Sequence, residues 1–424
     1  PDTSWREVGR GLTPVTAGDL GQIDTSRYDN GLYQIGLRVV DVNGAETTAG
    51  VTVDFVGNLK LGQFRLSFAD IRADAQGIPL MLTRTYDSAK KDIAGDFGFG
   101  WSASGNDVTV RKNVTFGSAW TVVQRQLQLC IVPQGKRRIS ITLPDGGLYR
   151  FDAANSPECA FGQAPAVNIV FTPVPGPTGG PAGRLNATGQ LKVVDGALVQ
   201  AQGGRLIDDE GNTWNPRDFE LTTEEGVKYL LREGAGILHV TDAWGNRVTY
   251  GANGYQHSAN LGLSLTRDAQ GRITRATDPA GRSVTYTYNA AGELDAVTDR
   301  DGKTTRFAYA TVAGANTGAT SGNADQQHLL ARITDPRGQV IMANQFDALG
   351  RLTGTADAQG QAAQQSFDLA TNTQTVTDRR GNRTVYTFDA DGNITRSVNA
   401  LGQTTTYTYD ANGNELTTTN ALGQ

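Results

Sequence analysis

The chain has 424 residues, of which 52 are glycine and only 2 cysteine, 2 methionine and 3 histidine. This glycine content, against an average usage of about 7%, argues against a helical bundle, because glycine inside a helix costs about 1 kcal/mol relative to alanine. The formal net charge of -5 and the absence of any Lys/Arg block give no electrostatic footprint for nucleic acid. No apolar run approaches the roughly 18 residues of a transmembrane helix, and 38% hydrophobic residues argue against disorder.

Residues 1–56 are predicted to form a separate β unit. Apolar residues alternate from Tyr33 to Val39 and again from Val51 to Phe55, and Asn43-Gly44 between them predicts a two-residue hairpin turn. The pair resembles the last strands of a bacterial immunoglobulin-like module. A complete sandwich of that kind needs about 100 residues, so we expect a partial module; alternatively, these strands extend the segment that follows.

Residues 57–216 are predicted to be rich in β-structure. Strand-like alternation runs through residues 58–70 and 77–88, and another hairpin is expected over 139–151, around Asp145-Gly146. The stretch 172–184 combines proline and glycine, which predicts a loop or linker.

A short motif, Asp/Asn-x-x-Gly, recurs through residues 217–424. Its glycines at 271, 281, 292 and 302 follow alternating shorter and longer steps, so the repeating unit has about 21 residues and contains two turns. An Asp side chain can bond the backbone two residues later, and glycine supplies a positive φ, so each motif predicts a turn. The clearest predicted turn residues are Asp268, Gly271, Asp278, Gly281, Asp347, Gly350, Asp389, Gly392, Asp410 and Gly413.

Between the turns, aromatic residues alternate with a period of two. Tyr407 and Tyr409 are one such pair, as are Tyr286 and Tyr288, which predicts a strand of about 5 residues between turns. A ribbon of hairpins buries its aromatic face only by stacking, which favours a solenoid. Two irregularities remain: Thr371 stands where a glycine is expected, and residues 311–327 read as an inserted loop.

These motifs resemble a known family. Tyr407-Thr408-Tyr409-Asp410-Ala411-Asn412-Gly413-Asn414-Glu415-Leu416 matches the YD-repeat pattern Y-x-Y-D-x-x-G-x-L with its leucine one position later, and residues 286–294 match it with Asn for Asp. The pattern is similar to that of the Rhs proteins, the B and C components of Tc toxins, and the teneurin shell; residues 57–216 resemble the lead-in of Rhs chains. The resemblance implies an all-β fold, with a YD-repeat β-hairpin spiral over 217–424, incomplete at its C-terminus. This curved solenoid sheet would form part of a hollow shell, preceded by the β-rich lead-in and the partial β-sandwich-like segment.

Few residues suggest chemistry. Cys130 and Cys159, in the same β-rich stretch, form either a disulfide or two buried thiols, and neither has metal-ligand spacing to another Cys or His. The histidines His239, His257 and His328 are scattered, with no visible partner to orient a general base. No catalytic, cofactor-binding or metal-binding residue is therefore predicted.

The resemblance implies a non-catalytic structural part of a secreted or cell-surface protein. Its shell would enclose or present a C-terminal toxin or effector domain that is not in this chain, and no partner nucleic acid or membrane span is expected. The alternative is an adhesin that binds a cell-surface glycan or protein in cell–cell contact. Trp244 and Tyr255 motivate this alternative, since aromatic faces stack on sugars, although aromatic side chains in sheets more often pack between strands.

Overall fold

The computed structural model describes residues 7–11, 15, 18–21, 23–55, 60–161, 166–174, 187–194, 198–310, 326–410 and 415–424. This described part is all-β, as predicted, with two short 3-10 turns, η1 (Thr25–Arg27) and η2 (Ser88–Lys90), beside its strands. None of its helical segments is long and apolar enough to cross a membrane. Parts of several sequence-based expectations lie outside the described residues: residues 1–6 and 56 of the N-terminal unit, 58–59 of the first predicted strand after it, 175–184 of the linker, 311–325 of the inserted loop, and Gly413.

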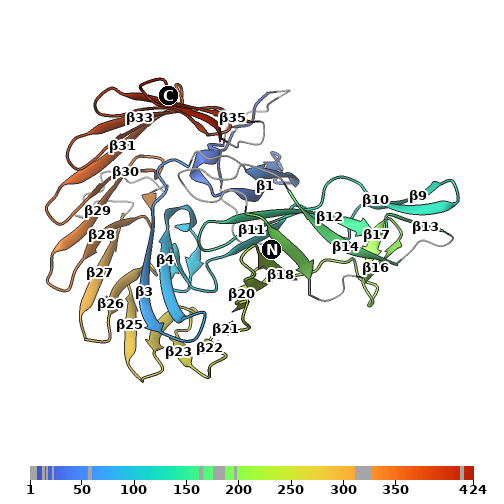
Figure 1. The fold of residues 1–424 in the computed structure, drawn as a ribbon, viewed down its shortest axis with the longest axis horizontal. Helices are drawn as coiled ribbons and strands as arrows, with labels where there is room; N and C mark the ends of the chain where they lie inside the picture. Colours follow the sequence, from blue (N-terminus) through green and yellow to red (C-terminus); the bar gives the residue numbers. More distant parts are fainter. Residues whose placement is uncertain are drawn as a thin grey trace.

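A single antiparallel sheet of 20 strands dominates the molecule and curls into a broad arc (Figure 1). From β18 onwards its neighbours are consecutive in the chain, as expected for a continuous ribbon of hairpins. Its strands are β15 (Gly189–Val193), β18 (Asp218–Thr223), β19 (Lys228–Arg232), β20 (Gly236–Thr241), β21 (Arg247–Gly251), β22 (Gly254–His257), β23 (Gly262–Arg267), β24 (Ile273–Thr277), β25 (Ser283–Tyr288), β26 (Leu294–Thr298), β27 (Thr304–Tyr309), β28 (Leu330–Thr334), β29 (Val340–Phe346), β30 (Leu352–Ala356), β31 (Ala362–Asp368), β32 (Thr373–Thr377), β33 (Arg383–Phe388), β34 (Ile394–Val398), β35 (Thr404–Tyr409) and β36 (Glu415–Thr419). We call β18–β36 the spiral.

The alternation of shorter and longer steps between the turn glycines has a structural cause. The longer step crosses a six-residue strand such as β25, and the shorter step crosses a five-residue strand such as β26. A register shift beside the turn accommodates the difference in length between the two strands: Thr287 pairs with Ala296, but Tyr288 pairs with Leu294. This bulge turns Leu294 and Val297, three positions apart, to the same face, where both are buried.

The Asp-x-x-Gly motif forms the turn that the sequence predicts. In the turn between β24 and β25, Asp278 Oδ1 accepts hydrogen bonds from the backbone N–H groups of Ala280 and Arg282, both at 2.9 Å. The Gly281 N–H donates to the Asp278 carbonyl at 3.0 Å, and Gly281 has φ +81°. Where Thr371 replaces glycine, the left-handed conformation moves one residue on, to Asn372 with φ +49°.

A small sheet lies inside the arc of the spiral (Figure 1). Its strands are β3 (Arg65–Ala73), β4 (Leu80–Asp87) and β7 (Trp101–Ala103), and the short pair β5 (Ala94–Gly95) and β6 (Gly98–Phe99) lies beside them in sequence. The buried face of this sheet shares one hydrophobic core with β21–β28 of the spiral. We call residues 64–104 the inner sheet.

A second core lies under an arm that projects from the start of the spiral (Figure 1). The six-stranded sheet of the arm has the order β17-β16-β14-β12-β11-β8, and a three-stranded sheet, β13-β10-β9, extends it. The bounds of these strands are β8 (Thr109–Lys112), β9 (Trp120–Arg125), β10 (Gln128–Pro133), β11 (Arg138–Thr142), β12 (Leu148–Ser156), β13 (Cys159–Phe161), β14 (Ala166–Pro173), β16 (Leu198–Gln202) and β17 (Arg205–Ile207).

The N-terminal unit is a hairpin of β1 (Gly31–Val40) and β2 (Glu46–Phe55), which pair only with each other among the described strands. The two-residue turn expected at Asn43-Gly44 is wrong, because β1 ends at Val40 and β2 begins at Glu46. The connection is instead another Asp-x-x-Gly turn, in which the Gly44 N–H donates to the Asp41 carbonyl at 3.1 Å. The assignment of residues 1–56 to a partial immunoglobulin-like module stays a prediction.

Candidate functional surface inside the spiral

The inner sheet is attached to the concave face of the spiral by aromatic side chains. The Trp101 ring packs edge-on against Phe307 of β27, with centroids 5.5 Å apart, and its indole N–H donates to the Tyr309 hydroxyl at 2.6 Å. The Tyr86 hydroxyl donates to the His328 carbonyl and accepts from the Leu330 N–H, both at 2.9 Å. These contacts join segments that are far apart in the sequence.

A buried ion pair lies at the centre of this interface. Arg84 of β4 is 2% exposed, and its guanidinium bonds both carboxylate oxygens of Asp70, at 2.9 and 3.2 Å. The Tyr286 hydroxyl of the spiral donates to the same carboxylate at 2.9 Å. Aromatic rings enclose the guanidinium, with its carbon 4.7 Å from the Phe68 and Trp101 centroids and 5.1 Å from that of Phe307. The inner sheet and the spiral thus share one charge pair inside an aromatic cluster.

This pair is absent from the residues predicted above, although the sequence contains a signal for it. Leu80, Leu82 and Tyr86 share one face of β4 and are fully buried, and Arg84 occupies the same alternating row. A charged residue in an otherwise apolar row predicts a buried partner. The partner is Asp70, which lies at the register shift between β3 and β4.

His328 has an oriented partner that the sequence did not indicate. Its Nδ1 lies 2.8 Å from Glu293 Oε1, and both side chains are buried. Its ring stacks on Phe99 of the inner sheet, with centroids 3.9 Å apart. His239 and His257 lie apart from this pair on β20 and β22, so the three histidines do not form one site.

Met342 of β29 is the last residue along the chain that packs on the core shared with the inner sheet, and beyond it the chemistry of the concave face changes. Phe307 and Ile333 are buried and pair across neighbouring strands on this face. The strand pairings that follow continue the same row of residues from strand to strand. The central positions of the row are Asn344, Thr355, Gln365, Gln374, Tyr386, Ser397 and Tyr407. Neighbouring members bond each other, as in Thr355 Oγ1 to Asn344 Oδ1 at 2.9 Å and Gln374 Nε2 to Gln365 Oε1 at 3.1 Å.

This row also lacks charge. Along the fully described stretch 342–409, the residues that the registers assign to the concave face are apolar, aromatic or uncharged polar. The charged residues of the stretch lie in the turns or on the convex face, as Arg383 and Arg396 do. We call this concave surface of β29–β35 the polar lining.

The predicted turn residues lie at the strand ends, around the rims of the spiral, rather than together in one site. Gly271, Gly281, Gly350 and Gly392 all have φ between +77° and +81°. Asp268, Asp347 and Asp389 each accept backbone hydrogen bonds from the residues two and four positions later, at 2.8 to 3.0 Å. Asp410 ends the described part of its turn. These residues shape the ribbon and offer no convergent chemistry.

A tyrosine directly before the YD turn forms a hydrogen bond to the backbone of the preceding strand. The Tyr409 hydroxyl donates to the Ile394 carbonyl at 2.8 Å, and Tyr288 makes the same bond to the Ile273 carbonyl. In both cases the partners have the same separation in sequence, so the bond repeats with the unit. The aromatic position of the repeat therefore has a polar role beside its packing role.

Tyr409→Phe is expected to lower the free energy of unfolding by about 1 kcal/mol, because it removes one hydrogen bond and keeps the ring. Urea unfolding measures this loss. Tyr407→Phe is the matched control, since the Tyr407 hydroxyl lies 3.5 Å from Ser397 Oγ and makes only a weak contact. Equal losses in both variants would contradict the tie between repeat units.

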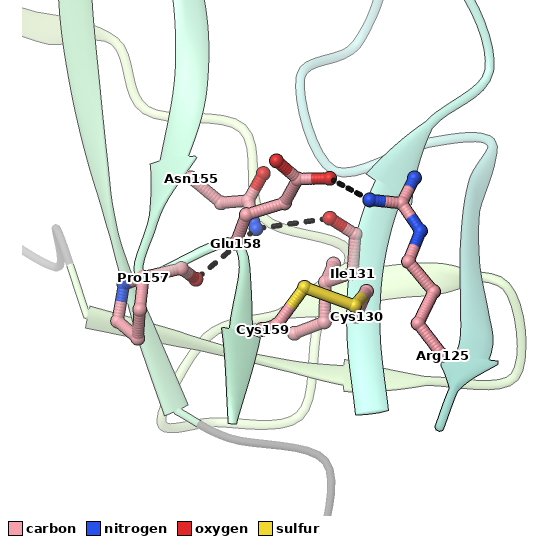
Figure 2. Close-up of a disulfide and its surroundings, with 7 residues drawn as sticks. All are labelled: Arg125, Cys130, Ile131, Asn155, Pro157, Glu158 and Cys159. Atoms are coloured by element: carbon pink, nitrogen blue, oxygen red, sulfur yellow. Dashed lines mark hydrogen bonds and ion pairs between the residues drawn. A yellow bond between two sulfur atoms is a disulfide. The ribbon is translucent and has the colours of Figure 1, made fainter. Parts of the chain in front are cut away.

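The two cysteines form a disulfide within the projecting arm, between β10 and β13 (Figure 2). Cys130 is fully buried, and it pairs directly with Cys159 across the strands. Two polar contacts flank the bond: Asn155 Nδ2 donates to the Ile131 carbonyl at 3.0 Å, and Arg125 pairs with Glu158 at 3.0 Å. The bond fixes the three-stranded extension of the arm.

Replacing both cysteines by serine is expected to destabilise the arm by about 3 to 4 kcal/mol in the loop-entropy model. Limited proteolysis should then cut within residues 120–161 of the variant before it cuts the spiral. Reducing agent should reproduce this pattern in the unmodified chain and change nothing in the double-serine variant. Cleavage of the spiral at the same rate as the arm would contradict a local role for the disulfide.

The two aromatic residues that motivate the adhesin alternative differ in exposure. Trp244, in the turn between β20 and β21, is 85% exposed. Tyr255 is buried, and its hydroxyl bonds the Ser104 carbonyl. Tyr255 therefore packs between the spiral and the inner sheet, and Trp244 alone of the two is available to a ligand.

Comparison with known families identifies the repeat. The RHS Repeat family model matches residues 267–304 and 388–424, which contain β24–β26 and β34–β36. Together with the unit of two Asp-x-x-Gly turns, this match defines a YD-type repeat protein. The chain therefore carries repeats of the Rhs/YD type over these residues, and it is similar to that family.

Solved structures similar to the chain include TcdB2-TccC3, with 11% identity, a TM-score of 0.29, and coverage of 89% of this chain and 28% of that chain. The TcdB2-TccC3-Cdc42 structure has 11% identity, a TM-score of 0.31, and coverage of 84% and 24%. The Photorhabdus luminescens Tc holotoxin pore has 12% identity, a TM-score of 0.26, and coverage of 91% and 24%. The chain spans only 19 to 28% of the length of such structures. A search of curated proteins gives no match.

Proposed function

We propose that the chain is the structural, non-catalytic wall of an Rhs-type shell that encloses or presents a C-terminal effector domain. The observation that carries this proposal is the change along the concave face of the spiral. Over β21–β28 that face is apolar and packs on the inner sheet, whereas over β29–β35 it is the polar lining, whose own strand residues are uncharged. A sheet that only packed on another layer would keep its apolar face throughout.

The polar lining suits a surface that meets water and a guest polypeptide. Amide and hydroxyl side chains such as Gln365 and Thr355 can bond water or a peptide backbone. The partly buried rings of Phe367 and Tyr386 offer apolar contacts. The Arg351 guanidinium lies 5.3 Å from the Phe367 ring centroid and adds a positive charge beside this face. A secreted or cell-surface location accords with this role and with the disulfide in the arm.

Protease protection tests the proposal on the natural protein that carries residues 1–424. The segment after the repeats is expected to be cut much more slowly within the intact protein than when it is produced alone. The exposed turn around Trp244 serves as an internal control for protease activity. Equal cleavage rates for the segment in the two settings would overturn the shell proposal.

An adhesin is the second candidate, and the exposure of Trp244 is the observation that favours it. Glycan-array binding that is lost in Trp244→Ala and kept in a variant of the buried Tyr255, Tyr255→Phe, would support it. No glycan binding by the intact protein, together with protection of the C-terminal segment, would eliminate it.

A further inference from the structure

Three side chains meet where the arm joins the spiral. Lys112 ends β8 of the six-stranded arm sheet, Asn215 lies in the connection before β18, and Glu233 follows β19 of the spiral. Lys112 Nζ lies 2.6 Å from Asn215 Oδ1 and 2.9 Å from Glu233 Oε2. An amine thus contacts both a carboxamide and a carboxylate, although Lys112 and Asn215 are far apart in the sequence.

The surroundings of Lys112 favour a reactive amine. Its side chain is only 5% exposed, and Nζ also donates to the Pro216 carbonyl at 2.8 Å and lies 5.6 Å from the Phe116 ring centroid. Burial lowers the pKa of the Lys112 amine, and the positive charge of Arg217 acts in the same direction, against the opposing effect of Glu233. A lowered pKa increases the fraction of neutral amine, which is the nucleophilic form.

We propose that Lys112 and Asn215 form an intramolecular isopeptide bond, with Glu233 as the proton carrier. The Glu233 carboxylate takes a proton from the Lys112 ammonium, and the neutral Nζ attacks Asn215 Cγ. The bond from Cγ to Nδ2 then breaks as Glu233 returns the proton to Nδ2, and Glu233 next takes the second proton from Nζ and passes it to the departing ammonia. The products are a secondary amide between the two side chains and one ammonium ion, so the protein loses the mass of one ammonia. One carbon–nitrogen bond forms and one breaks, so no oxidant or reductant is required.

The residue after Asn215 removes a competing reaction. Asparagine commonly loses ammonia when the next backbone nitrogen attacks its side chain, but the next residue is Pro216, which has no N–H. Loss of ammonia at Asn215 by that route is therefore blocked, and Lys112 Nζ is the amine in contact with the carboxamide. The resulting bond would join the arm to the spiral covalently and close a loop through both sheets.

Mass spectrometry of the reduced, denatured chain tests this proposal directly. The intact mass is expected to fall below the sequence mass by one ammonia, and digestion should yield the peptide of Lys112 linked to the peptide of Asn215. Lys112→Met and Glu233→Gln should restore the full mass. Asn215→Asp should lose one water instead of one ammonia, because a carboxyl group then accepts the amine.

Lys192→Met is the matched control, since Lys192 pairs with Glu220 at 2.9 Å on the surface. This variant should keep both the ammonia loss and the linked peptide. The proposal is overturned if the cooperatively folded chain has its full sequence mass. It is also overturned if the ammonia loss maps to another asparagine or persists in Lys112→Met.

Discussion

Asp70→Ala is expected to lower the free energy of unfolding by about 3 to 5 kcal/mol, because it leaves a buried guanidinium without its counter-charge. Arg84 is 2% exposed and has the Asp70 carboxylate as its ion-pair partner. The aromatic rings around it supply cation–π contacts, each worth about 2 kcal/mol or more when desolvated, but these contacts do not neutralise the charge. The substitution also removes the acceptor of the Tyr286 hydroxyl, so both the inner sheet and the spiral lose a contact.

Urea unfolding followed by tryptophan fluorescence measures this loss, since Trp101 packs beside Arg84. The matched control is the double variant Asp70→Leu with Arg84→Met, which removes both charges and keeps apolar volume. Removing both partners of a buried pair is often close to neutral, so most of the stability should return. A double variant as unstable as Asp70→Ala would show that the pair is not the source of the loss.

Gly98→Ala is expected to cost about 3 kcal/mol or more, from a left-handed backbone and from crowding. Gly98 in β6 has φ +90°, and a Cβ built there would lie 2.4 Å from the Gly292 carbonyl oxygen in a turn of the spiral. A backbone oxygen cannot move aside as a flexible side chain could. The substitution should therefore push the inner sheet away from the spiral and disturb the stacking of Phe99 on His328.

Thermal unfolding of Gly98→Ala, compared with that of Gly271→Ala, separates the loss due to the left-handed backbone from the loss due to crowding. Gly271 has φ +81°, but an added Cβ there meets nothing within 4 Å. The control should therefore lose only the conformational part, about 1 kcal/mol. Equal losses in the two variants would mean that the inner sheet does not approach the spiral closely at Gly98.

The spiral was predictable because its signals are local. An Asp and a Gly three positions apart determine a turn through bonds within the same few residues, as the contacts of Asp278 show. The irregular Thr371 also has a local solution, since the neighbouring Asn372 adopts the positive φ. At Asn43-Gly44 a competing local signal led to the wrong turn, because Asp41 two positions earlier already sets the longer Asp-x-x-Gly geometry.

The contacts across the spiral were not predictable, because they join distant residues with no fixed spacing. Tyr86 reaches His328, and Lys112 reaches Asn215, through the way the sheets fold over one another. Periodicity indicates which residues face inward, but it does not indicate which of them meet another layer. The same limit applies to the polar lining. Gln365 and Phe307 occupy equivalent positions in the repeat, and the spacing does not indicate that Phe307 lies in the core shared with the inner sheet whereas Gln365 does not.

An experimental structure that traces individual strands tests most directly whether the spiral curves around the inner sheet. We expect one continuous antiparallel sheet from β18 to β36, with the Tyr86 hydroxyl bonded to the His328 carbonyl. We also expect residues 64–104 to leave the polar lining uncovered. A flat sandwich over residues 240–424, or an inner sheet on the convex side of the spiral, would contradict it.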